Sequence, residues 1–291
     1  MGKTFFQRGP EIADFSFEME GRAVEFLMLR EDLLDPIVSG NKFRKIGLFQ
    51  EQMAAGGFAG IASCGGPFSN HLHALARAGY LFGFSTKGLV PGKHFSFLSP
   101  TLQDCQKWGM ELEMVSREEF AEIRYAKESP EGLAANMLWK GEGGYSEEMY
   151  TPYQLLDFGG LEVDEVHVGV GSGGTCGGLL LNESLKAKCV VAYPCSPNSE
   201  SVFEDLMELE KGSGKNFIWV EDHLLEAYGK MSPDLLDFVA QFELKSGVKL
   251  DPIYTSKMMR YAVRSLDWGG GVSRLFVHTG GLQGWNGMKQ A

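Results

Sequence analysis

A lysine at the start of a predicted helix is the strongest candidate for chemistry in this sequence. It lies in Ser39-Gly40-Asn41-Lys42-Phe43-Arg44-Lys45, which follows the apolar run Leu27–Asp32. Glycine and asparagine before Lys42 would let its amine approach a ligand closely, while Arg44 and Lys45 add positive charge. Such an amine could form a Schiff base with a ligand aldehyde. A solvated, basic helix start is the alternative interpretation.

A glycine loop later in the chain could bind a phosphate. Gly169-Val170-Gly171-Ser172-Gly173-Gly174-Thr175 joins a predicted strand to a predicted helix. Its N–H groups could form an anion nest at the helix start, with Thr175 both capping the helix and bonding the anion. The loop also fits GxGxxG, but the following strand ends in Pro194-Cys195 without an acidic residue for a ribose. A phosphate cradle is therefore favoured over a dinucleotide site or a purely structural turn.

A second glycine loop, Gly65-Gly66-Pro67-Phe68-Ser69-Asn70-His71, also precedes a predicted helix. Ser69, with the N–H groups of Asn70 and His71, could hold a carboxylate there. An ordinary helix N-cap at Ser69 or Asn70 is the alternative. Taken together, the two loops suit ligands that carry one phosphate and one carboxylate.

Three hydroxyl side chains complete the set of candidates. Tyr254 and Tyr228 could line a pocket, or could simply pack by their rings. Thr279 follows a predicted strand and precedes a glycine pair, so its hydroxyl could point into a pocket at the carboxyl edge of a sheet, or cap locally. His71 and His73 are two residues apart and point to different faces of a helix, so we expect no metal site.

The elements that must position these residues alternate between strand and helix, which predicts open, mainly parallel α/β sheets with helices on both faces. We predict strands at 23–29, 60–63, 82–90, 111–115, 163–170, 189–193, 217–220 and 275–277. We predict helices at 42–55, 70–78 (ended by Gly79), 101–108, 117–128, 155–158, 175–184, 196–213, 234–245 and 253–263. Residues 139–145 are loose in pattern and are interpreted as a crossing between two domains.

The amino-acid composition limits the kinds of partner that the chain is expected to bind. The chain has 291 residues, 44% of them hydrophobic, and a net charge of −11, which argues against nucleic acid or an anionic membrane. No apolar run approaches the roughly 20 residues of a membrane span, and the start lacks the apolar core of a signal peptide. The five cysteines form no CxxC pair, so a reducing cytoplasm is expected. Positive charge around Lys42 then fits a small anionic ligand.

The motifs occur in an order that resembles the pyridoxal-phosphate enzymes that include 1-aminocyclopropane-1-carboxylate (ACC) deaminase and D-cysteine desulfhydrase. The similarity extends from about residue 27 to 288. It rests on Leu29-Arg30-Glu31-Asp32, Ser39–Lys45, Gly65–His71, Glu142-Gly143-Gly144, Gly171–Thr175, Leu250-Asp251-Pro252-Ile253-Tyr254-Thr255-Ser256-Lys257 and His278-Thr279-Gly280-Gly281.

This resemblance implies the two-domain fold type II (tryptophan synthase β-like), with a larger cofactor-binding domain at 1–44 and 139–291 and a smaller domain at 45–138. It implies a homodimer acting on a small amino acid. It also assigns roles. Lys42 would carry pyridoxal 5'-phosphate, and Asn70 would bond its phenolic oxygen. The phosphate would be held by Lys45 and by the loop of Gly171, Ser172, Gly173, Gly174 and Thr175. The substrate carboxylate would be bound by Ser69, Asn70 and His71, and the reacting carbons would lie near Tyr254 and Tyr228.

Thr255 and Thr279 separate two branches of this family. Threonine at both positions resembles the desulfhydrase pattern. The deaminases are similar to one another in having glutamate at the position of Thr255 and leucine at the position of Thr279. A threonine offers the cofactor ring nitrogen only a neutral hydrogen bond, which suffices for losing a good β-leaving group. We therefore expect a D-cysteine desulfhydrase-like α,β-elimination, with ACC deamination as the alternative. The sequence is also compatible with a non-catalytic binder of a vitamin B6 phosphate or an amino-acid derivative, and with a nucleotide-dependent oxidoreductase. Pro67-Phe68 replaces the commoner Ile-Gln of the family before Ser69.

Overall fold

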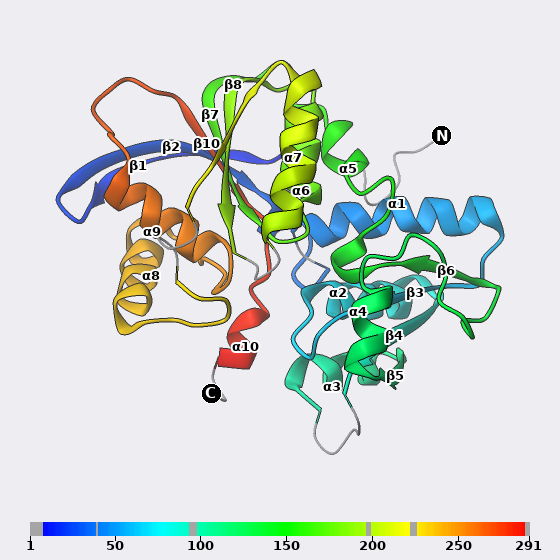
Figure 1. Ribbon diagram of the computed structural model, residues 1–291. Coiled ribbons are helices and arrows are strands. Elements are labelled where there is room, and N and C mark those ends of the chain that lie inside the picture. Colours follow the sequence, from blue (N-terminus) through cyan, green and yellow to red (C-terminus); the bar gives the residue numbers. More distant parts are fainter. Residues whose placement is uncertain (1–7, 39, 93–97, 196–198, 222–225, 289–291) are drawn as a thin grey trace. The chain divides into compact units, whose positions relative to one another are not determined.

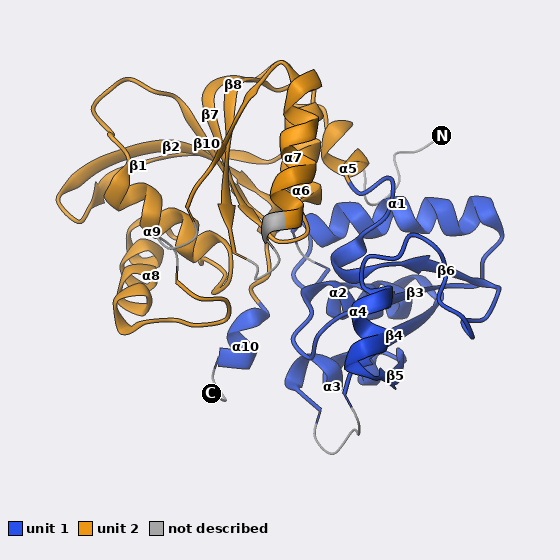
Figure 2. Ribbon diagram, viewed as in Figure 1, with its two compact units in different colours: residues 1–8, 35–149, 283–291 blue, residues 9–34, 150–282 orange. Residues whose placement is uncertain are grey.

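The computed structural model describes residues 8–38, 40–92, 98–195, 199–221 and 226–288 (Figure 1). Ser39 of the lysine motif lies outside the described residues. The chain divides into two compact units, which are coloured in Figure 2. Unit 1 comprises residues 1–8, 35–149 and 283–291, and unit 2 comprises residues 9–34 and 150–282. The boundaries expected from sequence fall after residues 44 and 138, whereas the units change after residues 34 and 149. Residues 1–8 and 283–291, which were expected in the larger domain, belong to unit 1.

Unit 2 is built on a six-stranded sheet in which only the first strand runs antiparallel to its neighbour. The strand order is β1 (Ile12–Met19), β2 (Arg22–Arg30), β10 (Arg274–His278), β7 (Glu162–Val170), β8 (Lys186–Pro194) and β9 (Asn216–Trp219). The edge strand β1 alternates between exposed and more buried positions, whereas every residue of β10 is buried. This contrast is expected, because a central parallel strand is covered on both faces.

The helices of unit 2 cover both faces of this sheet. They are α5 (Thr151–Gln154), α6 (Gly174–Leu181), α7 (Ser199–Ser213), α8 (Pro233–Ser246) and α9 (Thr255–Ser265), with a short 3-10 turn, η1, at Glu31–Leu33. Figure 1 shows α6 and α7 on one side of the sheet and α8 and α9 on the other. The apolar core between α6, α7 and the sheet includes Val166, Val168, Leu179 and Val190, each fully buried.

Unit 1 contains a four-stranded, wholly parallel sheet. Its order is β5 (Glu111–Val115), β4 (Ser85–Pro91), β3 (Gly60–Cys64) and β6 (Met137–Lys140). The accompanying helices are α1 (Asn41–Gly56), α2 (Asn70–Phe82), α3 (Pro100–Lys107), α4 (Arg117–Ile123) and α10 (Gly284–Met288), with a 3-10 turn, η2, at Glu142–Gly144. The predicted class of open, mainly parallel α/β sheets is thus confirmed in both units.

The described helices begin in more than one way. The helices α2, α3, α4 and α8 each begin after a serine whose hydroxyl accepts a main-chain N–H: Ser69, Ser99, Ser116 and Ser232. Helices α1 and α6 instead begin after Gly40 and Gly173, at φ of 67° and 81°, and no described side chain caps them. Lys42 lies at the first of these two glycine starts, and the loop at Gly169–Thr175 leads into the second. The third predicted site, at Ser69, Asn70 and His71, lies at a serine-capped start.

Several element predictions were wrong for identifiable reasons. Helix α2 does not end at Gly79 but continues to Phe82, and Gly83 is the left-handed residue that closes it. Gly79 is required for packing, because a Cβ there would lie 2.5 Å from Thr86 Cγ2. Residues 155–158 are not helical, since α5 ends at Gln154.

The predicted crossing at 139–145 is also wrong in part. Trp139 and Lys140 belong to β6, which pairs with β3 inside unit 1. The strand is short and is followed by a glycine-rich turn, so its pattern is too brief to stand out in the sequence. The edge strand β1 was not predicted as a separate strand, and α4 ends at Ile123, earlier than the predicted 128.

Within the described ranges, no helix is both long and apolar enough to cross a membrane.

All five cysteines are buried and form no disulfide. Burial raises the pKa of the Cys105 thiol to about 12, which keeps it in the unreactive thiol form.

Candidate functional site

Two loops meet at the carboxyl edge of the sheet in unit 1. Strands β3 and β6 run in parallel with Ser63 opposite Lys140, so the loops that follow them leave the sheet side by side. The Ser63 hydroxyl donates a hydrogen bond to the Gly141 carbonyl oxygen at 3.1 Å. The Gly65–His71 segment is thereby brought next to the Glu142–Gly144 turn, although about 70 residues of sequence separate them.

Lys42 is the second residue of α1. Burial of its amine lowers the pKa of Lys42 to about 8, and only the negative charge of Glu142 opposes this shift. At pH 7 about a tenth of such amines are neutral, against roughly three in ten thousand for an ordinary lysine. A neutral amine is the form that attacks an aldehyde, so Lys42 suits the covalent role predicted for it.

Lys45 lies one helical turn beyond Lys42, on the same face of α1. Its side chain is only 1% exposed, and its Nζ donates to the Gly143 carbonyl oxygen at 3.0 Å. Gly143 and Gly144 both have positive φ, at 66° and 82°, which most side chains avoid. Burial, together with the Lys42 charge, lowers the pKa of Lys45 well below its usual value. The structure therefore anchors Lys45 to the glycine turn of its own unit.

The serine of the loop at Gly65–His71 acts as a helix cap. The Ser69 hydroxyl accepts the Leu72 N–H at 3.2 Å, so the capping alternative is what the structure shows for this side chain. Gly65 must be glycine, since a Cβ there would lie 2.5 Å from Ser69 Oγ. Asn70 is the first residue of α2 and is partly exposed.

His71 is a buried imidazole beside the two lysines. It is 1% exposed, and neither ring nitrogen has a hydrogen-bond partner among the described residues. Its ring packs edge-on against Phe49, with the two ring centroids 6.1 Å apart. Burial and the charges of Lys42 and Lys45 lower the pKa of His71 well below its usual value. The ring is therefore neutral at physiological pH and contributes no positive charge to an anion site.

The loop at Gly169–Thr175 connects β7 to α6 in unit 2. Gly171 and Ser172 lie in the bend, Gly173 has a φ of 81°, and Gly174 is the first helical residue. The predicted capping role of Thr175 is wrong, because the N-cap position belongs to Gly173, which has no side chain. The helix start offers main-chain N–H groups, which is what an anion cradle requires.

Tyr254 packs directly on this loop. A Cβ on Gly169 would lie 2.9 Å from Tyr254 Cβ, and a Cβ on Gly171 would lie 2.9 Å from Tyr254 Oη. The glycines at these two positions thus admit the tyrosine as well as shaping the turn. Sequence alone gave no signal for this contact, because about 85 residues separate its two sides.

Thr255 is completely buried, and its hydroxyl is engaged by Asp251. The Thr255 hydroxyl donates to Asp251 Oδ2 and accepts the Asp251 N–H at 2.9 Å. The same carboxylate accepts the main-chain N–H groups of Tyr254 and Thr255, both at 2.8 Å. Asp251 therefore satisfies main-chain N–H groups just before and at the start of α9, where Tyr254 holds the N-cap position, and the proton of the Thr255 hydroxyl is used by the same carboxylate.

Thr279 follows β10 at the carboxyl edge of the sheet in unit 2. It is 6% exposed, and its hydroxyl forms no hydrogen bond within the described part of the chain. Because β10 pairs in parallel with β7, Thr279 emerges at the same edge as the loop at Gly169–Thr175. Tyr228 lies in a turn of the same unit and is 55% exposed.

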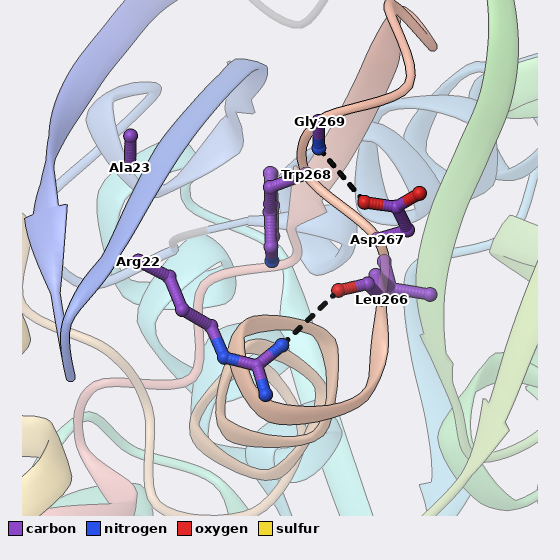
Figure 3. A pocket seen from close by; sticks show the side chains of 6 residues that line it. All are labelled: Arg22, Ala23, Leu266, Asp267, Trp268 and Gly269. Carbon is purple, nitrogen blue, oxygen red and sulfur yellow. Dashed lines mark hydrogen bonds between the residues drawn. The ribbon is translucent and has the colours of Figure 1, made fainter.

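A surface cavity of about 340 Å³ in unit 2 contains none of the predicted residues (Figure 3). It is lined by Arg22, Ala23, Leu266, Asp267, Trp268 and Gly269. Two of its polar groups are already satisfied locally, since Arg22 donates to the Leu266 carbonyl at 3.3 Å and Asp267 accepts the Gly269 N–H at 2.9 Å. The chemistry predicted from sequence thus lies elsewhere, at the two sheet edges and the start of α1.

Several known proteins are similar to this chain over most of its length. No protein-family model matches the chain. A Pyrococcus abyssi protein named as a candidate ACC deaminase is 28% identical over 298 residues, 90% of this chain and 86% of its own. A bifunctional mitochondrial D-cysteine desulfhydrase/ACC deaminase of Arabidopsis thaliana is 25% identical over 297 residues, 89% of this chain and 73% of its own.

Among solved structures, the crystal structure of an ACC deaminase homologue superimposes with a TM-score of 0.71 at 23% identity, covering 90% of this chain and 86% of that one. These similarities confirm the predicted resemblance to the ACC deaminase and D-cysteine desulfhydrase family and the predicted fold type II class. The same similarities confirm the prediction that the chain is an enzyme.

Proposed function

We propose that this chain is a pyridoxal-phosphate lyase in which Lys42 is the covalent attachment point. The observation that carries the proposal is the amine of Lys42, which burial keeps partly neutral near pH 7. The remaining residues fit the cofactor as well. A helix that begins at Gly173 offers N–H groups for a phosphate, and the buried Thr279 hydroxyl is available to a ring nitrogen.

Bound pyridoxal phosphate would supply the electron sink for a carbanion at the substrate α-carbon. Lys42 would then act twice, first as the attachment point and afterwards as the base that accepts the α-proton at Nζ. Its lowered pKa supports this second role, since a general base works best with a pKa near the operating pH. The Tyr254 and Tyr228 hydroxyls would handle protons close to the reacting carbons.

Separate elements would bind the anionic groups. Main-chain N–H groups of residues 171–175 would hold the phosphate, and the Lys45 amine would assist them. Asn70 would hold the phenolic oxygen. The substrate carboxylate would be bound at the start of α2 by Ser69 and its neighbours. Because the Ser69 hydroxyl already caps α2, we propose that main-chain N–H groups carry much of that binding.

For the substrate, we propose a D-amino acid with a β-leaving group, such as D-cysteine. Elimination followed by addition of one water would give pyruvate, ammonia and hydrogen sulfide. Thr279 supports this choice, because a hydroxyl is a neutral partner for the ring nitrogen. Thr255 supports it less directly than its sequence position suggests, since its hydroxyl proton is used by Asp251.

The alternative substrate is ACC, which with one water would give 2-oxobutyrate and ammonia. This alternative is retained because the names of the Pyrococcus abyssi and Arabidopsis thaliana relatives both include ACC deaminase. A panel of D-cysteine, L-cysteine, D-serine and ACC, assayed for each oxoacid, separates the two substrates. We expect pyruvate from D-cysteine. Turnover of ACC alone would overturn the substrate proposed here, and binding of cofactor without any turnover would favour a binding protein.

The charge of Glu142 offers a second test. Glu142 is the acidic group that raises the pKa of Lys42, and it also accepts the Arg124 Nε hydrogen bond at 2.8 Å. In Glu142→Gln the rate at which cofactor-free protein captures pyridoxal phosphate should rise with pH through a midpoint below that of the wild type. Arg117→Gln, on the exposed surface of α4, is the control. An unchanged or higher midpoint in Glu142→Gln would contradict the role given to the Lys42 amine.

A homodimeric assembly and a cytoplasmic location remain predictions. Five cysteines that are buried as thiols are compatible with a reducing compartment. Light scattering of the purified protein measures the oligomeric state, and fractionation of the source cells measures the location.

A further inference from the structure

A fully buried lysine in unit 2 has no part in the chemistry proposed above. Lys257 lies on α9 with 0% of its surface exposed, and its Nζ donates to the carbonyl oxygens of Glu226 and Ala227, both at 2.9 Å. A buried ammonium group is costly unless it is hydrogen-bonded. These two main-chain carbonyls are therefore the reason that α9 can hold a lysine there.

The carbonyls belong to the turn that carries Tyr228. The Ala227 carbonyl also accepts the Lys230 N–H at 3.1 Å, which closes a four-residue turn with Tyr228 in its second position. Gly229 supplies the positive φ of 69° that the third position needs. Lys257 thus holds the first carbonyl of the turn, and that carbonyl fixes where the Tyr228 backbone begins.

The same turn is tied down by the side chain of Glu226. Its carboxylate accepts the Ser232 N–H at 2.9 Å and pairs with Arg260 at 2.7 Å. Ser232 in turn caps α8 through the Leu235 N–H at 3.1 Å. The segment from 226 to 232 is therefore joined to α9 at two points and to the start of α8 at a third.

The helix side of this attachment leads to the other proposed active-site tyrosine. Tyr254 is the residue immediately before α9, Lys257 lies three residues later and Arg260 three residues after that, so each is next to the following one on the helix surface. Tyr254 itself rests on the loop at Gly169–Thr175, against Gly169 and Gly171. One helix therefore sets the positions of both tyrosines.

We propose that Lys257 is a positioning residue, whose buried amine fixes the Tyr228 turn to the helix that begins at Tyr254. The proposal deepens the proposed function and rests on it for the role of the two tyrosines. The attachment itself, however, can be tested without any turnover. It predicts that loss of the amine loosens the turn and, through Tyr228, slows the reaction.

The variant to make is Lys257→Met, which removes the amine and keeps most of the side-chain volume. A matched control is Lys215→Met. Lys215 is also buried, at 8% exposure, and its Nζ also donates to two carbonyl oxygens, those of Leu180 at 2.9 Å and Asn182 at 2.6 Å. It holds the far end of α6 and not the Tyr228 turn. Should Lys257→Met fail to fold, Arg260→Gln removes the neighbouring tie instead.

Kinetics give the first result. Lys257→Met should lower kcat about tenfold or more with a smaller change in KM, while Lys215→Met stays within about twofold of wild type. In a Tyr228→Phe background, Lys257→Met should lower kcat by less than about twofold, because the two residues act through the same group. An equal loss in both backgrounds would show that Lys257 acts on general stability, and would overturn the proposal.

Amide hydrogen exchange gives the second result and does not depend on turnover. In Lys257→Met the peptide covering 226–232 should exchange at least about tenfold faster than in wild type, while a peptide from the middle of α8 is unchanged. Unaltered exchange at 226–232 would overturn the inference. If the wild-type protein turned over none of the amino acids, the proposed function would fail, and the exchange result would still judge the attachment.

Discussion

Replacing Lys42 by methionine should make the cofactor-free protein more stable near neutral pH. The reason is that burial disfavours the charged amine, as the lowered pKa of Lys42 indicates, and Glu142 compensates only in part. A methionine in the same place has a similar volume and no charge to desolvate. A residue kept for chemistry thus costs stability when its ligand is absent, which is a common trade-off at functional sites.

The size and sign of the effect follow from the pKa. Its fall from 10.5 to about 8 corresponds to an upper value of about 3 kcal/mol. Because Lys42 is partly exposed, solvent screening reduces the expected gain to about 1–3 kcal/mol. The folded-state pKa is depressed, so the cost is fully present below pH 8, fades as the pH rises from 8 to 10.5, and is absent above that. The advantage of Lys42→Met should shrink over the same window.

Urea unfolding of the cofactor-free proteins at about pH 7, 9 and 10.5 measures the difference. Lys107→Met, at an exposed position near the end of α3, controls for the change of residue type. Equal stability of Lys42→Met and wild type at neutral pH would refute the reasoning, and so would an advantage that stays constant up to the highest pH.

Two further pairs of variants test the contacts in unit 2. Gly169→Ala should destabilise the protein by about 1–3 kcal/mol in urea unfolding, because its new methyl group meets Tyr254 at the main chain and Cβ. Gly171→Ala should leave stability nearly unchanged but lower kcat about tenfold, because it displaces the Tyr254 hydroxyl; the opposite ranking in stability would contradict this packing. Thr255→Val should cost about 1–3 kcal/mol, because it removes the hydroxyl that accepts the buried Asp251 N–H and donates to the Asp251 carboxylate. Thr279→Val should keep its stability and lose kcat, and a Thr279→Val protein with full activity would remove Thr279 from the site.

Much of the fold and the site could be predicted from local signals in the sequence. Glycine-rich turns between an apolar run and a helix mark the loops at Gly65–Ser69 and Gly171–Thr175, and both loops do connect a parallel strand to a helix. The alternation of strand and helix predicts parallel sheets because βαβ connections allow little else. Lys42 stands out because Gly40 and Asn41 precede it at a predicted helix start, and α1 does begin at Asn41.

Contacts between distant parts of the chain could not be predicted in this way. The packing of Tyr254 on Gly171 and the hydrogen bond of Lys45 to Gly143 join segments about 80 to 100 residues apart. Gly79 looked like a helix end, because a glycine required by a neighbouring strand has the same signature as a C-cap glycine.

Local side-chain hydrogen bonds could not be predicted from the sequence either. Thr255 looked equivalent to Thr279 by family position, but only the folded chain shows that Asp251 uses its hydroxyl. Likewise, a serine that caps a helix and a serine that binds a carboxylate are the same residue type at the same place, and Ser69 proved to be a cap.

The central claim is that Lys42 is the residue that carries the cofactor. It is tested most directly by incubating the protein with pyridoxal phosphate, reducing it with borohydride, and locating the modified peptide by mass spectrometry. We expect the reduced cofactor on Lys42, and none on the Lys42→Ala protein. Reduced cofactor on Lys45 or on another lysine of the wild-type protein, or undiminished labelling of Lys42→Ala, would contradict it.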